Sequence, residues 1–348
     1  MATLCLCGYS AFARAQEGDV RMDSPFGVLE FFHWNHEWNN YKYPDARSRE
    51  RDVILMKKAG ISWVRMDFLW QEIEPSPGKF DFAKYDEIVE LLKKYGIGIL
   101  GILHYNTPWN SDAWNEPPKD NSLFVNYATR VISHYKGSVK YWEVWNEPDS
   151  ATYWNKQDGL KGYCRLLKEV YAAAKKADPQ CKVLNGGLAN GLLSVNRLYD
   201  DGTKDSFDIL NIHIFASPLH VDSIKGVTAF ARLAYKVMSR NGDAHKKIWV
   251  TEIGCPGVKK GLKVNNWWMG ENPDEAEQAR WVEKVYTALL GQEAVEKVFW
   301  AYFRDCDNHW GNGIDYFGLV RLNRSPKPAF SAYRKRALSW KKKKAEHK

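Results

Sequence analysis

The chain has 348 residues, of which 45% are hydrophobic and 26% charged, a composition typical of a folded globular protein. No apolar run approaches the roughly 20 residues that a membrane-spanning helix needs, so we expect no membrane span. The net charge of +8 includes a terminal lysine run that is more typical of a solvated tail than of a nucleic-acid site, so we expect no nucleic-acid partner; an anionic glycan or cell surface is a milder interpretation of this charge.

The first fifteen residues have the pattern of a secretory signal peptide. Residues Leu4–Phe12 are mostly apolar, and Ala13-Arg14-Ala15 before Gln16 has the small-x-small form of a cleavage site. The start lacks the usual basic residues, which leaves an ordinary buried segment as the alternative. We predict a signal peptide over residues 1–15 and therefore a secreted or periplasmic protein.

Short apolar runs alternate with amphipathic helical stretches along nearly the whole chain. This alternation predicts parallel strands joined by helical crossovers, and eight such runs favour a closed barrel over an open sheet. We predict an α/β fold, a single (β/α)8 TIM barrel over residues 16–340, with a basic tail over residues 341–348. The predicted strands are Gly27–Phe32, Trp63–Asp67, Gly98–His104, Tyr141–Asn146, Lys182–Gly186, Ile209–His213, Ile248–Glu252 and Val298–Tyr302.

Two of the predicted helices have clear ends. The stretch Tyr85–Lys94 has apolar residues at helical spacing and stops before Gly96. Asn272-Pro273-Asp274-Glu275 supplies a polar cap, a proline and two acids, which favour a helix start.

Glutamates stand at the ends of the fourth and seventh predicted strands. Glu147 ends the run from Lys140, and Glu252 ends the run from Lys247. Catalytic residues of such barrels lie at the carboxyl ends of strands, and cleavage of a glycosidic bond requires two carboxyl groups that face one cavity. The alternative is that each glutamate merely caps the following helix.

Several motifs resemble the retaining glycoside hydrolases of clan A, whose fourth strand ends in Asn-Glu-Pro and whose seventh ends in Glu. The resemblance runs from about Phe26 to about Tyr333 and is greatest to family 39, then family 5, and the two are not ranked firmly. Family 39 xylosidases usually carry an additional β-sandwich, for which this chain has little length to spare. The motifs are Trp63-Val-Arg65, Trp70, Ile73-Glu74-Pro75, Gly78-Lys-Phe-Asp-Phe82, Trp142-Glu-Val-Trp-Asn-Glu-Pro148, Phe317-Gly-Leu-Val320 and Pro326-Lys-Pro-Ala-Phe330.

The resemblance implies a role for each matching residue. It makes Glu147 the acid/base, Glu252 the nucleophile of a double displacement, and Asn146 a ligand of the sugar 2-hydroxyl. It makes Arg65 the support of the nucleophile, although a plain salt bridge is the alternative. Relatives often have a tyrosine two residues after the histidine of strand six, where this chain has Phe215, so the hydrogen-bond partner of the nucleophile is open.

His104 and His213 end strands three and six, where the clan often places groups that contact substrate. We expect both histidines to contact substrate, and the alternative is that each is a core histidine with its hydrogen bonds satisfied.

Sixteen tryptophans are several times the average usage, and most follow strand ends. Aromatic rings stack on the C–H faces of sugars, so this placement predicts binding of an extended glycan and cleavage inside a polysaccharide. The resemblance makes Trp300 the floor of a sugar subsite, and we expect Trp34, Trp70 and Trp109 to bind sugar as well. The tryptophans at or beyond strand ends are Trp34, Trp38, Trp70, Trp109, Trp114, Trp145, Trp154, Trp267, Trp268, Trp300 and Trp310.

Other functions remain as alternatives. A catalytically silent carbohydrate-binding barrel need not keep both glutamates, and a transglycosylase would use the same pair. A metal-dependent hydrolase has four candidate ligands, but two of them are three residues apart at a strand end, where alternation points them to opposite faces. We therefore expect no metal and no cofactor. The four candidate ligands are His33, His36, His104 and His213.

The cysteines show no C-x-x-C spacing, so they predict no zinc or redox motif. Cys255 and Cys306 follow neighbouring strands, and either a disulfide in an oxidising compartment or two free buried thiols fits this placement. The sequence favours a monomer without fixing the oligomeric state.

Overall fold

The computed structural model describes residues 23–37, 42–156, 158 and 160–346 of the chain. The predicted signal peptide over residues 1–15 lies outside the described residues.

Eight parallel strands form a nearly closed barrel, which confirms the predicted fold. The hydrogen-bonded order is β5-β4-β3-β2-β1-β8-β7-β6, so each strand pairs with its neighbours in sequence. β5 and β6 form no continuous ladder: two isolated parallel bridges, Leu184 to Ile209 and Leu188 to Ile212, and hydrogen bonds between Asn185 and Asn211 join them. The strands are β1 (Phe26–Leu29), β2 (Trp63–Leu69), β3 (Gly98–His104), β4 (Tyr141–Val144), β5 (Lys182–Asn185), β6 (Leu210–His213), β7 (Ile248–Ile253) and β8 (Val295–Trp300).

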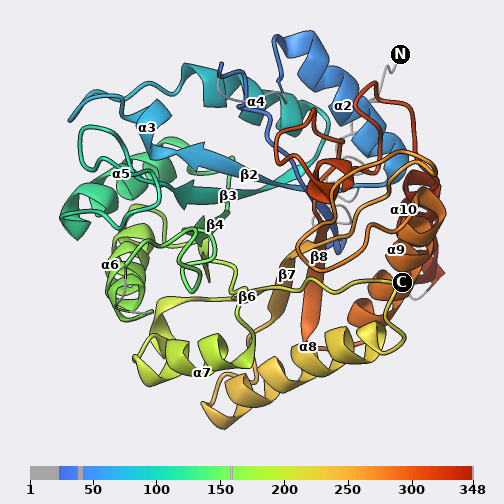
Figure 1. The fold of residues 1–348 in the computed structure, drawn as a ribbon. Helices are drawn as coiled ribbons and strands as arrows, with labels where there is room; N and C mark the ends of the chain where they lie inside the picture. Colours follow the sequence, from blue (N-terminus) through green and yellow to red (C-terminus); the bar gives the residue numbers. More distant parts are fainter. Residues whose placement is uncertain (1–22, 38–41, 157, 159, 347–348) are drawn as a thin grey trace, which may run out of the picture.

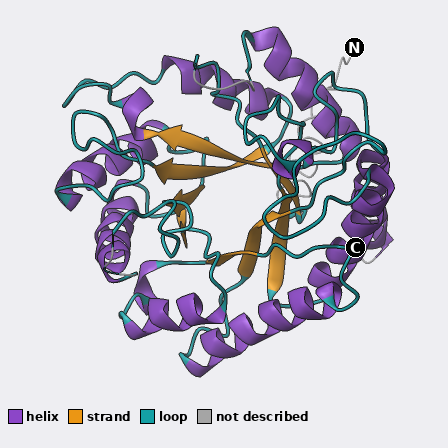
Figure 2. Ribbon diagram, viewed as in Figure 1, coloured by secondary structure: helices purple, strands orange, loops and turns teal. Residues whose placement is uncertain are grey.

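The helices surround the strands as an outer ring (Figures 1 and 2). Two short 3-10 helices, Lys204–Ser206 and Gly313–Tyr316, lie in the loops. The helices are α2 (Ala46–Ala59), α3 (Trp70–Ile73), α4 (Ala83–Lys94), α5 (Asn121–His134), α6 (Lys161–Ala177), α7 (Leu192–Asp200), α8 (Ser223–Arg240), α9 (Glu275–Leu290) and α10 (Pro328–Glu346).

The residues of β2 show how one strand serves both layers of the fold. Successive side chains of a strand point to opposite faces, so Trp63, Arg65 and Asp67 share one face. Trp63 belongs to an aromatic and aliphatic cluster that fills the barrel interior, whereas Arg65 contacts acids at the catalytic end and Asp67 lines a cavity there. The lower barrel is thus a packed core, and the upper barrel is polar. The interior cluster is Trp63, Leu100, Leu184, Ile209, Trp249 and Phe299.

The start of α9 differs in detail from the prediction. Asp274, not Asn272, caps the helix: its carboxylate accepts from the backbone N–H of Glu277, whose side chain accepts from the N–H of Asp274. This reciprocal pair satisfies two backbone donors at the helix start. Asn272 donates instead to the carbonyls of Val264 and Asn265.

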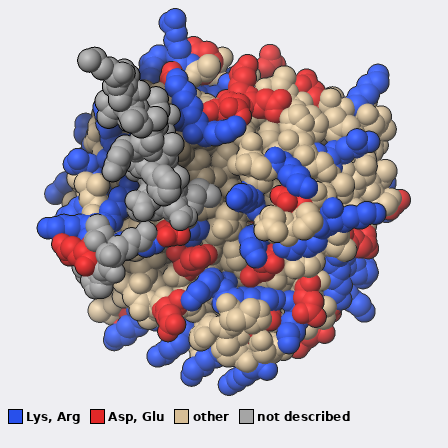
Figure 3. Space-filling view, turned by 180° about the vertical axis from the view of Figure 1, so that it is seen from behind, with Lys and Arg blue, Asp and Glu red and all other residues tan. Residues whose placement is uncertain are grey.

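The C-terminal lysines do not form a separate tail in the described residues. Helix α10 continues through residue 346, and Nζ of Lys344 pairs with Asp23 at 2.5 Å. Lysines and arginines are spread between acidic and uncharged side chains over the face seen in Figure 3. Among the described helices, none is long and apolar enough to cross a membrane.

Candidate active site

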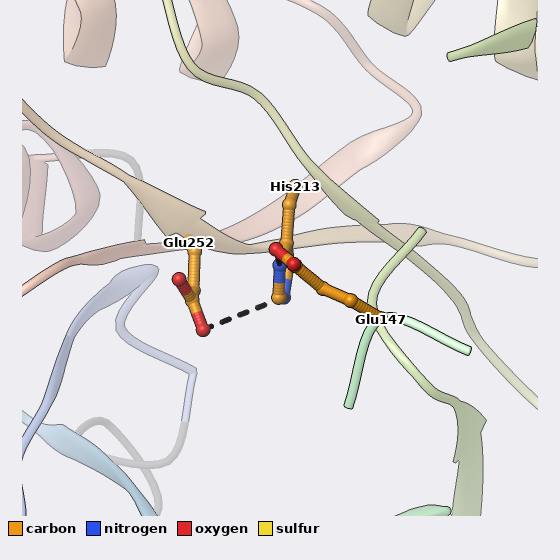
Figure 4. A group of neighbouring side chains, drawn as sticks. All are labelled: Glu147, His213 and Glu252. Atoms are coloured by element: carbon orange, nitrogen blue, oxygen red, sulfur yellow. Dashed lines mark hydrogen bonds and ion pairs between the residues drawn. The ribbon is translucent and has the colours of Figure 1, made fainter. Parts of the chain in front are cut away.

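Two glutamates and a histidine from three strands meet at the carboxyl end of the barrel. Glu147 follows β4, His213 ends β6 and Glu252 lies near the end of β7 (Figure 4). Nδ1 of His213 lies 2.7 Å from Oε1 of Glu147, and its Nε2 lies 3.8 Å from Oε1 of Glu252. One oxygen of each carboxylate and a ring nitrogen all lie within 4.8 Å of one another. The fold therefore brings together the two acids that the sequence singled out.

The backbone after β4 is unusual on both sides of Asn146. Trp145 has a φ of 68° and Glu147 a φ of 43°, both in the left-handed region that residues other than glycine rarely adopt. Each such residue costs roughly 1 to 3 kcal/mol and is found where the surrounding structure fixes it. These turns direct Asn146 toward Arg65 and Glu147 toward His213.

Arg65 of the second strand donates hydrogen bonds to two acids, Glu143 and Glu252. Its Nε and Nη2 donate to the two oxygens of Glu143, at 2.7 and 2.8 Å, and its Nη1 donates to Oε1 of Glu252 at 2.6 Å. Nη2 also donates to Oδ1 of Asn146 at 2.7 Å, which leaves the amide nitrogen of Asn146 as the donor for another ligand. Arg65 therefore supports Glu252, as the resemblance implied. The sequence analysis missed Glu143, because a charged residue inside a strand resembles an exposed one.

The two catalytic candidates differ in what opposes the effect of burial. Burial and the nearby charge of Asp149 raise the pKa of Glu147 to about 8. Burial also raises the pKa of Glu252, but His213 and Arg65 oppose this rise. Because Arg65 binds Glu252 directly, a single proton shared by the pair resides on Glu147 near neutral pH.

A chain of hydrogen bonds fixes which nitrogen of His213 carries its proton. The amide nitrogen of Asn211 donates to the carbonyl of Asn185, so its Oδ1 accepts from the hydroxyl of Thr251 at 2.6 Å. The Thr251 oxygen can then accept from Nε2 of His213, 3.0 Å away. Burial lowers the pKa of His213 and keeps the ring neutral. Its Nδ1 is therefore an acceptor, and the partner that donates to it is the protonated carboxyl of Glu147.

A cavity of about 600 Å³ opens beside this pair. Five residues that the sequence analysis assigned to the site line it: Trp34, Arg65, His104, Asn146 and Glu252. Glu147 and His213 adjoin this set through Glu252 without belonging to the lining. The other lining residues are Leu29, Phe31, Asp67, Leu69, Gln71, Ile102, Tyr105, Asn106, Trp114, Thr152, Tyr153, Tyr302, His309 and Trp310.

The lining contains two groups of aromatic rings. The first, here named the β8 wall, is Phe31, Trp34, Tyr302 and Trp310. Its rings stack in pairs, with centroids 4.0 Å apart for Phe31 and Trp34 and 5.0 Å apart for Tyr302 and Trp310.

The second group, here named the β4 wall, is Tyr105, Trp114 and Tyr153, from the loops after β3 and β4. The edge of Trp114 meets both tyrosines, with centroids 4.7 and 6.1 Å away. Of the tryptophans expected to bind sugar, Trp34 lines the cavity, and so do Trp114 and Trp310 from the wider set beyond strand ends.

Asp67 presents a carboxylate to the cavity between two histidines. Its oxygens lie 3.0 Å from Nε2 of His104 and 3.4 Å from Nε2 of His33. Burial opposes ionisation, but His104 and His33 hold the pKa of Asp67 below its usual value. His36 contacts Glu72 instead.

The four histidines weighed as metal ligands thus have different acidic partners: Asp67 for His33 and His104, Glu72 for His36, and Glu147 for His213, while the rings of His33 and His36 lie with centroids 6.4 Å apart. Within the described residues, one set of three His, Cys, Asp or Glu side chains has its ligand atoms within 4.8 Å, and it is the set Glu147, His213 and Glu252.

Three predicted sugar-binding tryptophans are structural. Trp300 is fully buried, and its Nε1 donates to the carbonyl of Phe317 at 2.8 Å. Trp70 is also fully buried and donates to Glu74, whose carbonyl accepts from Trp109. None of the three lines the cavity, because a position beyond a strand end does not determine the direction of the ring. Tyr302, two residues after Trp300, lies at the cavity instead.

Cys255, Cys306 and Phe215 lie in the loops that follow β7, β8 and β6. Cys255 and Cys306 are free buried thiols, and burial raises the pKa of both, so the disulfide alternative is wrong. Phe215 packs against Trp268 and Phe317, and the nucleophile candidate Glu252 accepts a hydrogen bond from Arg65 rather than from a residue at position 215.

Comparison with known protein families shows the family of the chain. The model described as "Glycosyl hydrolase catalytic core" matches residues 113–333, which contain both Glu147 and Glu252. The chain belongs to this glycosyl hydrolase family. A model described as "Beta-galactosidase" matches residues 37–107 of the glycosyl hydrolase.

Curated relatives of this glycosyl hydrolase include β-galactosidases and xylanases. It is 32% identical to "Beta-galactosidase bgaB" of Geobacillus kaustophilus over 41% of the chain and 20% of that enzyme. It is 26% identical to "Endo-1,4-beta-xylanase" of Agaricus bisporus over 62% of the chain and 72% of that enzyme. The match to "Beta-galactosidase BgaH" of Haloferax lucentense spans only 9% of that enzyme, so the chain matches small parts of several relatives.

Solved structures of glycoside hydrolases share the fold of this glycosyl hydrolase. A family 39 enzyme from Bacteroides cellulosilyticus has a TM-score of 0.70 at 23% identity, covering 92% of this chain and 65% of its own. Xylanase 10B from Thermotoga maritima has a TM-score of 0.66 at 17% identity, covering 94% and 98%.

Proposed function

We propose that this glycosyl hydrolase cleaves β-linked glycans by a retaining double displacement, with Glu147 as acid/base and Glu252 as nucleophile. The observation that carries the proposal is the spacing of the pair. One carboxylate oxygen of Glu147 lies within 4.8 Å of one carboxylate oxygen of Glu252. Inverting enzymes hold their carboxyl groups about 6.5 to 9.5 Å apart to admit a water. A gap this small favours direct attack by one carboxylate.

In the first step Glu252 attacks the anomeric carbon, and the bond from that carbon to the glycosidic oxygen breaks. The proton of Glu147 passes to the departing oxygen, which leaves as an alcohol. Arg65 holds the nucleophile ionised, and the amide of Asn146 is placed to donate to the sugar.

In the second step Glu147, now ionised, accepts a proton from water. The water oxygen bonds to the anomeric carbon, and the ester bond to Glu252 breaks. Two inversions leave the product with its original configuration.

The substrate that best suits the cavity is an extended polysaccharide cut at internal bonds. The two aromatic walls offer stacking surfaces in the cavity that Glu252 lines, and one similar protein is named an endo-1,4-β-xylanase. Sizing the products on β-linked glycans tests this part: early release of oligosaccharides supports internal cleavage, and steady release of monosaccharide contradicts it.

A 2-deoxy-2-fluoroglycosyl fluoride tests the mechanism. We expect it to inactivate the enzyme and to label the peptide that contains Glu252, with NMR showing a product of retained configuration. Labelling of another residue, or an inverted product, would contradict the assignment. Turnover of a glycan excludes a silent binding barrel, and unchanged turnover in the presence of a chelator excludes a metal-dependent hydrolase.

Export of the protein is part of the proposal, because residues 1–15 have the pattern of a signal peptide and polymeric glycans lie outside cells. The N-terminal sequence of the mature protein tests it: a start at Gln16 supports export, and an intact leader contradicts it.

A further inference from the structure

One residue of the β4 wall belongs to the loop that carries the acid, and the other two belong to the neighbouring loop after β3. Tyr153 lies in the loop that follows Glu147, and its carbonyl accepts from Nε1 of Trp145 at 2.8 Å. The ring of Trp145 meets that of Tyr105, with centroids 5.6 Å apart. This wall therefore has a fixed position relative to Glu147.

Hydrogen bonds between the two loops hold Trp114 over the tyrosines. Its carbonyl accepts from the N–H of Asn106, and the next residue, Asn115, bonds to both Thr152 and Asn155. Trp114 is nevertheless 49% exposed, so one face of this well-anchored ring is open to solvent. An anchored and exposed tryptophan at a cavity edge is suited to stacking on a ligand.

The two walls belong to different carboxylates. After burial, the charge of Glu252 contributes most to the raised pKa of Tyr302. For Tyr153, the charge of Glu147 raises the pKa more than the charge of Glu252 does. Tyr302 follows β8, which pairs with the β7 strand of the nucleophile. Tyr302 of the β8 wall thus lies on the side of the nucleophile, and Tyr153 of the β4 wall lies in the loop of the acid.

We propose that Tyr105, Trp114 and Tyr153 form the binding site for the leaving-group sugar, the unit that accepts the proton of Glu147. This inference rests on the proposed function, because the acid must face the leaving group and the nucleophile must face the sugar that becomes attached. The ligand of the β4 wall is an uncharged pyranose, bound through its C–H face against Trp114. The same site receives any acceptor alcohol that attacks the glycosyl enzyme.

The experiment separates this site from the rest of the reaction. The enzyme is inactivated with 2-deoxy-2-fluoro-β-glucosyl, galactosyl and xylosyl fluorides, whose leaving group is a fluoride ion that needs no sugar site. Excess reagent is removed, and recovery of activity is followed in buffer alone and with cellobiose or xylobiose as acceptor.

We compare the wild type with Trp114→Ala. The matched control is Trp268→Ala, because Trp268 is 57% exposed and lies outside the cavity lining. We expect all three proteins to be inactivated, and to recover in buffer, at rates within about twofold of each other. Acceleration by the disaccharide should fall about tenfold in Trp114→Ala only, a stacking effect of the expected size.

The outcomes distinguish the two proposals. Normal trapping with an equal acceptor response in Trp114→Ala overturns the assignment of the β4 wall and leaves the retaining mechanism intact. Slower trapping of Trp114→Ala by the fluorides also overturns it, since that result places the ring at the attached sugar. If no fluoride traps the wild type at Glu252, the retaining mechanism and this inference fail together.

Discussion

At the scale of single residues, the proton of Glu147 sets the alkaline limit of activity. The acid must be protonated in the first step, and its pKa is raised to about 8, so the competent form is lost as pH rises through about 8. Glu252 must be ionised, and its pKa is also raised by burial, so activity is lost on the acidic side at a pH above that of an ordinary carboxylate.

We therefore expect a bell-shaped profile of kcat/KM whose optimum lies below pH 8, between the raised pKa of Glu252 and that of Glu147. Glu147→Gln should lose the alkaline limb on aryl glycosides whose leaving groups need little protonation, while keeping the acidic limb. An alkaline limb that survives in Glu147→Gln would assign it to another group.

Thr251 is a positioning residue in this scheme, since it acts on Glu147 only through His213. Thr251→Val removes the oxygen that accepts from Nε2, so the ring can carry its proton on Nδ1 and donate to ionised Glu147. We expect the alkaline limb of kcat/KM to move down by roughly half to one pH unit, the equivalent of about one hydrogen bond.

Thr251→Ser is the matched control, because it keeps the hydroxyl and should restore the wild-type profile. A purely structural role for Thr251 would lower activity at every pH without moving the limb. That result would contradict the assigned orientation of the histidine.

At the scale of strands, the pair formed by Arg65 and Glu143 joins β2 to β4 across the intervening strand β3. Both side chains are about 1% exposed or less, so removal of one leaves a buried charge without its partner. We expect Arg65→Met to lower the free energy of unfolding by about 3 to 5 kcal/mol, measured by urea denaturation.

The double variant Arg65→Met with Glu143→Leu should recover a large part of that loss, because no unpaired charge remains. Equal stability of the single and double variants would show that the pair is not coupled. Both variants should be inactive, since Arg65 also supports Glu252.

All eight strands were predictable because each is an apolar run in a regular alternation with helices. The ends were less certain: β8 begins at Val295, three residues before the predicted start, because Glu296 interrupts the apolar pattern. The two catalytic candidates were predictable because acids that end two strands of one barrel meet at its carboxyl edge, and because both match motifs of the clan. The direction in which a tryptophan ring points was not predictable from the sequence, because it depends on how the loops pack, as Trp109 and Trp300 show.

At the scale of the whole molecule, the charge of the surface and the charge of the cavity have opposite signs. The chain carries a net charge of +8, but its cavity lining contains Asp67 and Glu252 against the single arginine Arg65, which already pairs with Glu143. A carboxylate on the bound sugar would meet like charges in a partly buried site. The milder interpretation of the net charge, an anionic glycan, is therefore not supported at the cavity.

We expect an aryl β-glucoside to be cleaved at least about tenfold faster, in kcat/KM, than the matched aryl β-glucuronide. Asp67→Asn removes one of the repelling charges and should narrow this ratio. A preference for the glucuronide, or a ratio unchanged in Asp67→Asn, would contradict the electrostatic explanation.

The seam between β5 and β6 divides the chain into two parts that hold one catalytic candidate each. This seam has isolated bridges and hydrogen bonds between Asn185 and Asn211 in place of a continuous strand ladder, and the turn at Gly202 that precedes β6 is exposed. A split enzyme cut after Gly202 would have Glu147 in one fragment and Glu252 in the other, so neither fragment alone could complete a double displacement. Activity regained on mixing the two fragments would therefore measure how much of the barrel has reassembled, without any added reporter group.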